Sequence, residues 1–341
     1  MNPYYLNENS QKRLVIFLLF ASTFGAGVTY THFSTPDVAQ GYALRAKIDN
    51  YKYVSPLLAC QENSDKFEEF SELKQKIESL TRASQQTGQI AYASIYFRDP
   101  SHGQSFSINN ENTYSPASLL KVPLMMAILK QAETDPTILN KNILYRKDPI
   151  NVTPLIEVPM LTDNTKYSID ELIKGMIIDS DNDAKDLLRI EINKKILAET
   201  YTELGIQTPY DAQTEDASSA YQISAKTYGL FFRVLYNATF LDRDMSEKAL
   251  QILTDTKFTK GIRAGIPSDT EIAHKYGVRV SQEEGEQMIE LSDCGIIYNT
   301  SRPYILCIMT KGKNVHELSA YITSIAATLD ASMSSNAIAH R

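Results

Sequence analysis

The sequence predicts an α/β fold of the α+β type, in which two lobes share one domain. Two strand patterns precede residue 111, three more follow residue 257, and the residues between these limits are mostly helical. Strands from both ends of a domain can join one antiparallel sheet, and a long helical insert between them packs as a separate lobe. We therefore expect a five-stranded antiparallel sheet flanked by helices, beside an all-helical lobe of about residues 111–257.

Each element follows from a local pattern. A helix over residues 66–85 carries an apolar stripe at helical spacing, whereas Ile90–Phe97 is rich in the aromatic and β-branched residues typical of strands. A turn at Asp99–Gly103 connects this strand to the next one. The other predicted strands are Ser105–Ile108, Glu271–Val280, Met288–Tyr298 and Tyr304–Thr310, and a helix over residues 316–331 closes the domain.

The first 64 residues differ from the rest of the chain. Residues 14–31 carry no charge and follow Lys12 and Arg13, which favours a membrane-spanning segment with a cytoplasmic N-terminus. We expect a single-pass cell-membrane anchor with the domain on the extracytoplasmic side. The alternative is a cleaved signal peptide followed by secretion, because small residues occur within the segment. The predicted parts are a cytoplasmic N-terminus (1–13), the membrane segment (14–31), a linker (32–64), the domain (65–334) and a tail (335–341).

Composition and cysteine content narrow the choice of partners. The net charge is -7, and no basic stripe carries interleaved aromatic residues, which argues against nucleic acid. No cluster of cysteine and histidine has metal-ligand spacing, so we expect no metal, and nothing indicates another cofactor or a required protein partner. Cys294 and Cys307 flank a turn and could face each other across a hairpin, with Cys60 as a third candidate. We favour buried, unpaired thiols.

Ser118 and Lys121 stand at the predicted start of an apolar helix. Residues three apart share one face of a helix, so the lysine can lie against the serine hydroxyl and act as its base. The same Ser-x-x-Lys pattern at Ser71 and Lys74 falls on the solvated face of another helix and predicts no such chemistry. Ser118 and Lys121 are therefore the candidate nucleophile and base.

Two further motifs are informative when they are considered together with Ser118. A Ser-Asp-Asn motif begins at Ser180, just after the helical pattern of Ile169–Ile178 ends and where another begins, and it would also suit a plain helix cap. A Lys-Tyr-Gly motif begins at Lys275 within a predicted strand. A lysine there can place a cation beside a groove, and a glycine lets a ligand approach the backbone. The structural alternative for this lysine is a charge that protects a sheet edge.

Together and in this order, the motifs resemble those of the class A β-lactamase and penicillin-binding protein superfamily, namely Ser-x-x-Lys, Ser-Asp-Asn and Lys-Thr-Gly. The first two match fully and the third matches at two of its three positions. The resemblance covers about residues 65–334. It implies a β-lactamase-like two-lobe fold and a serine hydrolase whose partners are β-lactams or D-alanyl peptides of the cell wall.

The resemblance also implies a role for each matching residue. Ser118 would attack an amide-like carbonyl, and Lys121 would take its proton, with Lys275 as the neighbouring cation that lowers the pKa of Lys121. Ser180 would pass a proton to the leaving nitrogen. The remaining implied roles are substrate binding by Asn182, Tyr276 and Gly277, an oxyanion hole from the backbone N–H groups of Ser118 and Val278, and bracing of the loop by Asp181.

Two positions depart from the family pattern. Tyr276 replaces a threonine or serine whose hydroxyl helps to bind the substrate carboxylate, and a phenol reaches farther than that hydroxyl. Arg279 lies on the same strand face as Lys275, so it is the candidate that compensates in substrate binding. The second departure is a missing Glu-x-x-x-Asn pattern in the loop 208–218, which would activate the deacylating water.

Candidate deacylation bases remain in that loop, with Glu215 first and Asp216 and Asp211 after it. Without a positioned base, we expect a long-lived acyl-enzyme. The sequence therefore favours a β-lactamase-like serine hydrolase with slow deacylation, and the alternatives are a penicillin-binding D,D-peptidase, a non-catalytic sensor or scaffold, and an esterase on the same scaffold. A Ser-His triad is disfavoured, because His274 lies in a strand and His102 in a turn.

Overall fold

The computed structural model describes residues 44–45, 51–59, 70–147, 161–210, 220–299 and 302–339. The chain divides into two compact units, and the first, Met1–Tyr42 with Gln61–Asn63, lies wholly outside the described residues. The predicted N-terminus and membrane segment belong to that first unit. Among the described residues, no helix combines the length and the apolar character needed to cross a membrane. The second unit consists of Ala43–Cys60 with Ser64–Arg341.

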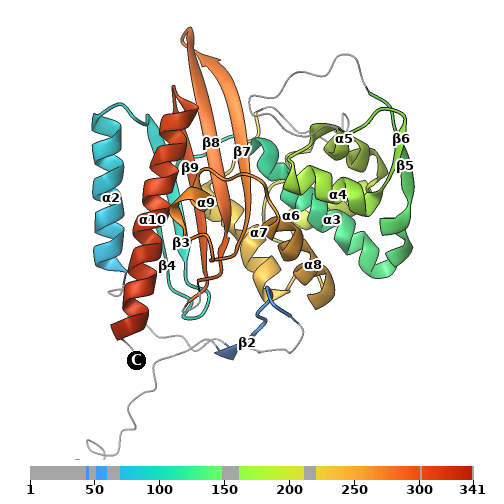
Figure 1. Cartoon of the computed structure of the whole chain (residues 1–341), viewed down its shortest axis with the longest axis horizontal. Coiled ribbons are helices and arrows are strands. Elements are labelled where there is room, and N and C mark those ends of the chain that lie inside the picture. The colour runs from blue at the N-terminus through green and yellow to red at the C-terminus, as the bar shows by residue number, and fades with distance from the viewer. Residues whose placement is uncertain are drawn as a thin grey trace, which may run out of the picture. The chain divides into compact units, whose positions relative to one another are not determined.

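The described residues form the predicted five-stranded antiparallel sheet, in the order β4-β3-β9-β8-β7 (Figure 1). Strands from both ends of the domain meet where β3 pairs with β9, which confirms the predicted topology. The hairpin of β7 and β8 extends past the end of β9, whose last residue, Gly312, pairs with Ile289. The strands are β3 (Tyr92–Arg98), β4 (Ser105–Ile108), β7 (Ile272–Glu283), β8 (Glu286–Ile297) and β9 (Tyr304–Gly312).

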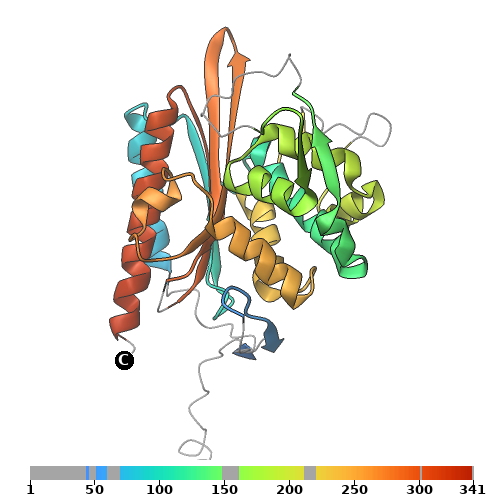
Figure 2. The same cartoon turned by 45° about the vertical axis from the view of Figure 1, so that its right-hand side comes forward.

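Helices α2 (Ser71–Gln86) and α10 (Val315–Ala339) cover one face of the sheet, as Figure 2 shows with the sheet nearly edge-on. The short helix α9 (Ile262–Gly265) packs against α10. In α2, Leu73 and Ile77 of the predicted apolar stripe are buried and Leu80 is half-buried. By contrast, Ser71 is exposed and Lys74 lies near Glu78 at 3.8 Å. The second Ser-x-x-Lys copy therefore lies on a solvated helix face, as predicted.

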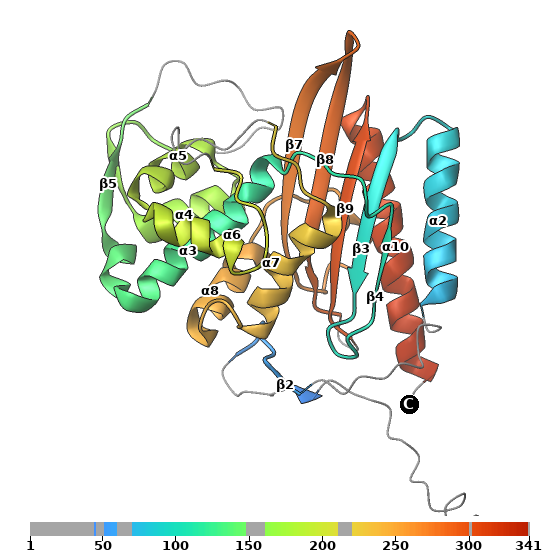
Figure 3. The ribbon, with the colours of Figure 1, turned by 180° about the vertical axis from the view of Figure 1, so that it is seen from behind.

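The helical lobe covers the other face of the sheet, and α7 (Ala225–Asn237) lies between the sheet and the rest of this lobe (Figure 3). At Gly229 an added Cβ would lie 2.6 Å from the Tyr96 ring of β3, so the close approach requires glycine. Helix α3 (Lys121–Thr134) is buried at ten of its fourteen residues, as the apolar run predicts. The other elements are η1 (Ala117–Leu120), η2 (Pro136–Asn140), α4 (Ile169–Ile178), α5 (Asn182–Glu191), α6 (Lys194–Thr202) and α8 (Arg243–Thr254).

The prediction of an all-helical lobe is wrong in one detail. A short strand β5 (Asn142–Tyr145) pairs antiparallel with β6 (Thr165–Ser168) at the edge of the lobe. Both strands have four residues and lack a clear alternation of buried and exposed side chains, so neither gives a strand signal in the sequence. Ser168 then starts α4 through a capping box with Glu171, which explains the predicted helix boundary.

Part of the predicted linker is attached to the domain. The backbone N–H groups of Lys52, Tyr53 and Val54 donate to the Glu247 carboxylate of α8, at distances between 2.5 and 3.0 Å. A carboxylate that accepts several backbone N–H groups forms strong, charge-assisted hydrogen bonds. This segment therefore docks on the helical lobe before the chain reaches α2. It is flanked by a two-stranded ribbon of β1 (Leu44–Arg45) and β2 (Leu57–Ala59).

Candidate active site

Ser118 lies in the 3-10 helix η1, directly before α3. Contacts hold this turn from two sides, since the Leu119 N–H donates to the Pro116 carbonyl at 2.9 Å and the Tyr228 hydroxyl donates to the Leu119 carbonyl at 2.8 Å. Ala117 has a φ of 46°, a left-handed conformation that costs about 1–3 kcal/mol for a residue with a Cβ. Ser118, which is half-buried, is therefore presented by a strained turn that its surroundings hold in place.

Lys121 is buried beneath the loop between α4 and α5, with 1% of its surface exposed. Its Nζ donates to the Ser180 carbonyl at 2.6 Å, to Ser180 Oγ at 3.1 Å and to Asn182 Oδ1 at 2.9 Å. These acceptors use all three N–H groups of an ammonium. Among the described residues, the polar partners of Lys121 are therefore in this loop, and the Ser118 hydroxyl is not one of them.

Ser180 connects the helical lobe to the sheet. Its Oγ accepts a hydrogen bond from Lys275 Nζ of β7 at 2.9 Å, in addition to the one from Lys121. A serine hydroxyl accepts up to two hydrogen bonds and donates one. Because both lysines are donors, the Ser180 proton is left for a third partner. A group that can give its proton to a bound molecule is what a leaving nitrogen requires.

Burial lowers the pKa of both lysines. The pKa of Lys121 falls to about 7, chiefly because burial disfavours the charged form, and the charge of Lys185 adds to the effect. Burial also brings the pKa of Lys275 well below its ordinary value, with a further contribution from the Lys121 charge. Lys185, rather than the predicted Lys275, is the neighbouring cation that lowers the pKa of Lys121. Lys121 is therefore suited to release a proton near neutral pH.

The other two residues of the Ser-Asp-Asn loop differ in role, since Asp181 stabilises the loop and Asn182 faces solvent. Asp181 is buried and accepts the Ala184 N–H at 2.8 Å, which caps α5 and agrees with the bracing role predicted for it. Asn182 is exposed and available to a ligand. Beside the loop, Lys257 pairs with Asp179 at 2.7 Å and ties the end of α4 to the segment after α8. The loop is thus fixed, with one amide side chain open to solvent.

Gly277 brings the turn that carries Ser118 against β7. An added Cβ would lie 2.7 Å from the Pro116 carbonyl oxygen and 3.2 Å from the Leu119 nitrogen. The close approach expected of a ligand at this glycine is therefore made by the protein's own backbone. Val278 follows on the same strand, which pairs with β8 and packs against η1 on its other side. The two segments that carry the predicted oxyanion donors are thus neighbours.

Arg279 braces the start of the same turn. Arg279 Nη1 donates to Ser115 Oγ at 3.0 Å, and the Ser115 N–H donates to Glu290 Oε2 at 2.9 Å. In the sheet register, Arg279 pairs with Glu290, and Glu290 pairs with Lys311. Arg279 therefore has a described role in holding the turn. Its predicted role in substrate binding stays a prediction.

Tyr276 forms part of the wall beside Lys275. Its ring stacks on Phe258 with centroids 4.0 Å apart, and Lys275 Nζ lies 4.2 Å from its centroid. Burial raises the pKa of the phenol, and the Ser180 side chain acts in the opposite direction. Only 7% of Tyr276 is exposed. The predicted substrate-binding tyrosine is therefore packed within the protein.

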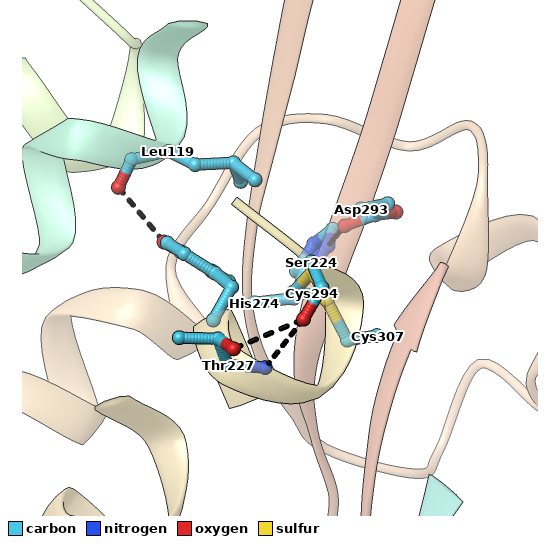
Figure 4. Close-up of a disulfide and its surroundings, with 8 residues drawn as sticks. Leu119, Ser224, Thr227, His274, Asp293, Cys294 and Cys307 are labelled. Atoms are coloured by element: carbon cyan, nitrogen blue, oxygen red, sulfur yellow. Dashed lines mark hydrogen bonds and ion pairs between the residues drawn. A yellow bond between two sulfur atoms is a disulfide. The ribbon is translucent and has the colours of Figure 1, made fainter. Parts of the chain in front are cut away.

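Cys294 and Cys307 form a disulfide (Figure 4). The two cysteines pair in the register of β8 and β9, and Cys294 pairs with Lys275 on β7. The favoured prediction of unpaired thiols is wrong, because the hairpin register sets the two side chains directly opposite each other, with Cα atoms 3.9 Å apart. Cys60 lies outside the described residues.

The two histidines considered for a Ser-His triad have aspartate partners. His274 Nδ1 lies 2.9 Å from Asp293 Oδ1 (Figure 4), and His102 Nδ1 lies 2.7 Å from Asp99 Oδ2 in the turn after β3. Both aspartates are fully buried. The prediction that the chemistry of Ser118 does not use a histidine stays a prediction.

The candidate deacylation bases cannot be placed. Glu215, Asp216 and Asp211 all fall in residues 211–219, which lie outside the described residues. Their predicted role therefore stays a prediction, as does the slow deacylation inferred from this loop.

Three positioning residues escaped the sequence analysis, namely Tyr228, Phe258 and Glu290. The first two look like ordinary core aromatics in their local patterns. Glu290 alone gave a signal, because a carboxylate inside a buried strand pattern needs a partner. Its partner, the Ser115 N–H, lies 175 residues earlier in the chain, so the spacing of residues could not reveal it.

Comparison with known proteins agrees with this geometry. Residues 72–332 match the family described as the Beta-lactamase enzyme family. No curated protein sequence matches the chain. Among solved structures, PBP-A is 21% identical with a TM-score of 0.64 over 78% of this chain and 97% of that chain. A β-lactamase from Sphaerobacter thermophilus DSM 20745 is 17% identical with a TM-score of 0.60 over 75% and 95% of the two chains. At these identities the likeness concerns the fold.

A third similar structure carries a bound ligand. It is a mutant of PBP-A, described as an acyl-enzyme complex with penicillin G. It is 19% identical to this chain, with a TM-score of 0.63 over 77% of this chain and 97% of that one.

Proposed function

Because the chain belongs to the β-lactamase enzyme family, we propose that it is a serine hydrolase that forms an acyl-enzyme on Ser118. The observation that carries this proposal is the convergence of Lys121 and Lys275 on the Ser180 hydroxyl, at 3.1 and 2.9 Å. Lys121 stands one helical turn after Ser118. Two buried lysines around one hydroxyl supply a base for the nucleophile and a proton path to the leaving group.

In the proposed acylation, neutral Lys121 takes the Ser118 hydroxyl proton while Ser118 Oγ forms a bond to the carbonyl carbon. The backbone N–H groups of Ser118 and Val278 stabilise the oxyanion, and such a donor lowers the barrier by about 3–4 kcal/mol. The carbon–nitrogen bond then breaks as Ser180 gives its proton to the nitrogen. Lys121 returns the proton it took to Ser180, so that the acyl-enzyme has the same protonation as the resting site.

We propose β-lactams or D-alanyl peptides of the cell wall as substrates. The likeness of fold to PBP-A and to β-lactamases supports this class without choosing within it. Absence of the Glu-x-x-x-Asn pattern from residues 208–218 favours slow release of the acyl group. A penicillin-binding D,D-peptidase acting on cell-wall peptides is the second candidate, because slow release of the acyl group also fits such an enzyme. Glu215 is the loop residue to test.

A non-catalytic ligand-binding protein is the third candidate. The packing of Tyr276 against Lys275 supports it, because this packing narrows the site beside the predicted nucleophile. A sensor of this kind would bind β-lactams or cell-wall fragments without a covalent bond to Ser118.

We also propose that residues 14–31 anchor the chain in the cell membrane, with the domain on the extracytoplasmic side. The Cys294–Cys307 disulfide supports that side, because disulfides persist in oxidising compartments. Extraction of membranes distinguishes a retained membrane anchor from a cleaved signal peptide. An anchored chain should stay with the membrane at high salt and dissolve in detergent, whereas a cleaved chain should appear in the soluble fraction and begin after the small residues within the segment.

Labelling with a fluorescent penicillin tests the acyl-enzyme. The wild type should carry the label through denaturing electrophoresis, and Ser118→Ala should not. Ser71→Ala is the matched control, because Ser71 belongs to the solvated Ser-x-x-Lys copy on α2 and should leave labelling unchanged. Labelling that survives Ser118→Ala would remove Ser118 as the nucleophile.

A further inference from the structure

We infer that Tyr276 disfavours anionic groups at the β7 side of the site, so that among β-lactams and D-alanyl peptides the site prefers those whose group beside the scissile bond is neutral. The inference rests on the proposed function, since it names the substrate class of the same site. It begins with the ammonium of Lys275. This group is fully buried and donates to Ser180 Oγ at 2.9 Å and to the Tyr276 carbonyl at 3.2 Å.

The Tyr276 ring covers the same ammonium. Lys275 Nζ lies 4.2 Å from the ring centroid, within the range of a cation–π interaction. The ring thus occupies space beside the cation that an incoming carboxylate would need. Threonine or serine at position 276 would leave that space empty.

The ring is also fixed in its position. It stacks on Phe258 at an interplanar angle of 16°, and both side chains are more than nine-tenths buried. The segment that carries Phe258 is tied to β7, because Thr256 Oγ1 donates to the His274 carbonyl at 2.8 Å. Moving the ring aside would therefore disturb this segment as well as the side chain.

The other cations around the loop and the turn also have partners within the protein. Lys121 donates to three acceptors in the Ser-Asp-Asn loop, and Arg279 donates to Ser115. Lys257 pairs with Asp179 at 2.7 Å, and Lys185 lies 2.9 Å from Asp186. A substrate carboxylate would have to break one of these pairings and lose water at the same time, which disfavours anionic ligands.

A neutral ligand meets no such obstacle. Asn182 is exposed, and while its Oδ1 accepts from Lys121, its amide N–H groups can donate to a neutral amide or ester carbonyl. The described site therefore offers polar recognition without a free positive charge. This combination favours substrates whose group next to the scissile bond is an ester or an amide.

Penicillin G and its methyl ester test this inference, because they differ only in the carboxylate. The rate of acylation of Ser118 is measured by mass spectrometry for each probe and divided by that probe's own rate of alkaline hydrolysis. For the wild type we expect the normalised rate to be at least about tenfold higher with the methyl ester. Tyr276→Phe keeps the ring and should keep this preference. Tyr276→Thr removes the ring and should reduce the preference at least about tenfold.

The outcomes separate the inference from the function on which it rests. If both probes acylate Ser118 and the free acid is as fast as the ester in the wild type, the inference is wrong and the proposed function stands. If neither probe modifies Ser118 in the wild type or in Tyr276→Thr, the proposed function fails and the inference fails with it. The wild-type ratio decides the question even if Tyr276→Thr does not fold.

Discussion

Two buried lysines share one serine hydroxyl, and this arrangement governs the charge of the site. Lys121 and Lys275 both donate to Ser180 Oγ, and each is almost completely removed from water. Burial and the neighbouring positive charge both favour the neutral amine. The charge of Lys121 adds to the lowering of the Lys275 pKa, whereas the charge of Lys185 adds to the lowering of the Lys121 pKa.

Acylation of Ser118 should therefore depend on pH. The pKa of Lys121 is lowered to about 7, so the neutral base is fully present above that pH and falls about tenfold per unit below it. We expect the rate of labelling by penicillin G to rise with pH up to about 7 and then to level off. Stopped reactions analysed by mass spectrometry give this profile.

Two variants on α3 provide the controls for this profile. Lys121→Arg keeps a permanent charge and should lose acylation at every pH, whereas Lys130→Arg, whose parent residue pairs with Glu133 at 2.7 Å, should keep the wild-type profile. A wild-type rate that stays constant between about pH 5 and pH 9 would contradict the assignment of the base to Lys121.

At the residue scale, spacing along the chain predicted the members of the site better than their contacts. Lys121, Ser180 and Lys275 were named from the motifs, and the structure brings all three together. The direct contact expected between Lys121 and Ser118 is replaced by contacts to the Ser-Asp-Asn loop. Helical spacing shows which residues share a face, but it cannot show which acceptor a long side chain chooses.

Among the elements, η1 and β7 define where the nucleophile stands. They meet at Gly277, where the Pro116 carbonyl and the Leu119 nitrogen approach too closely for any side chain. The sequence predicted a close approach at this glycine but assigned it to a ligand. A glycine in a strand indicates that something comes near, and only the tertiary structure identifies what that is.

Gly277→Ala should therefore push the turn away from β7. We expect a loss of about 1–3 kcal/mol in the free energy of unfolding, and a larger proportional loss in the rate of acylation because Ser118 moves with the turn. Urea denaturation and penicillin labelling measure the two effects. Gly175→Ala in α4 is the control, since its Cβ would meet Ala184 at 3.8 Å and should stabilise the helix by about 0.5–1 kcal/mol.

If Gly277→Ala acylates at the wild-type rate and unfolds at the wild-type urea concentration, the turn does not depend on this contact. The comparison with Gly175→Ala matters because both substitutions add one methyl group. Only the first places it against protein backbone.

The hairpin of β8 and β9 should depend on its disulfide. Closing a loop of this length stabilises a protein by about 3 kcal/mol in the chain-entropy model. Replacing Cys294 and Cys307 together by alanine should lower the free energy of unfolding by an amount of that order, measured in urea. A single replacement should cost nearly as much as the double one, because either breaks the same bond. Alkylation of Cys294 and Cys307 in the native, unreduced protein would show that the disulfide is absent.

The elements themselves were largely predictable. Four strands of the sheet overlap the predicted segments, and Ser105–Ile108 and Ile169–Ile178 match their predicted bounds. Long segments with strong apolar periodicity gave these predictions. The ribbon of β5 and β6 was not predictable, because four-residue strands at a solvated edge carry almost no pattern.

At the scale of the whole molecule, residues 51–56 attach the preceding chain to the helical lobe. Glu247 gathers three backbone N–H groups, and Tyr51 donates from its hydroxyl to Asp244 at 2.6 Å. Neither contact could be predicted, because about 190 residues separate the partners and nothing local in the sequence links them. The order of the strands was predictable, because both ends of the domain carried strand patterns around one helical insert.

Glu247→Ala should detach this segment. We expect a loss of about 2–3 kcal/mol in the free energy of unfolding and faster proteolysis near residues 51–56, because three backbone donors lose a charged acceptor. Glu247→Gln keeps an acceptor and should lose less. Glu286→Ala removes an exposed carboxylate paired with Lys313 at 2.5 Å and should change neither property. Proteolysis rates equal for wild type and Glu247→Ala would refute the docking.

Peptide mapping of the protein after reaction with penicillin G tests the central claim most directly. The claim is that Ser118, served by Lys121, Ser180 and Lys275, becomes acylated. We expect one adduct with the mass of penicillin G, located by tandem mass spectrometry on Ser118 and absent from Ser118→Ala. An adduct on another residue, or reversible binding with no adduct on wild-type protein, would contradict the proposed chemistry.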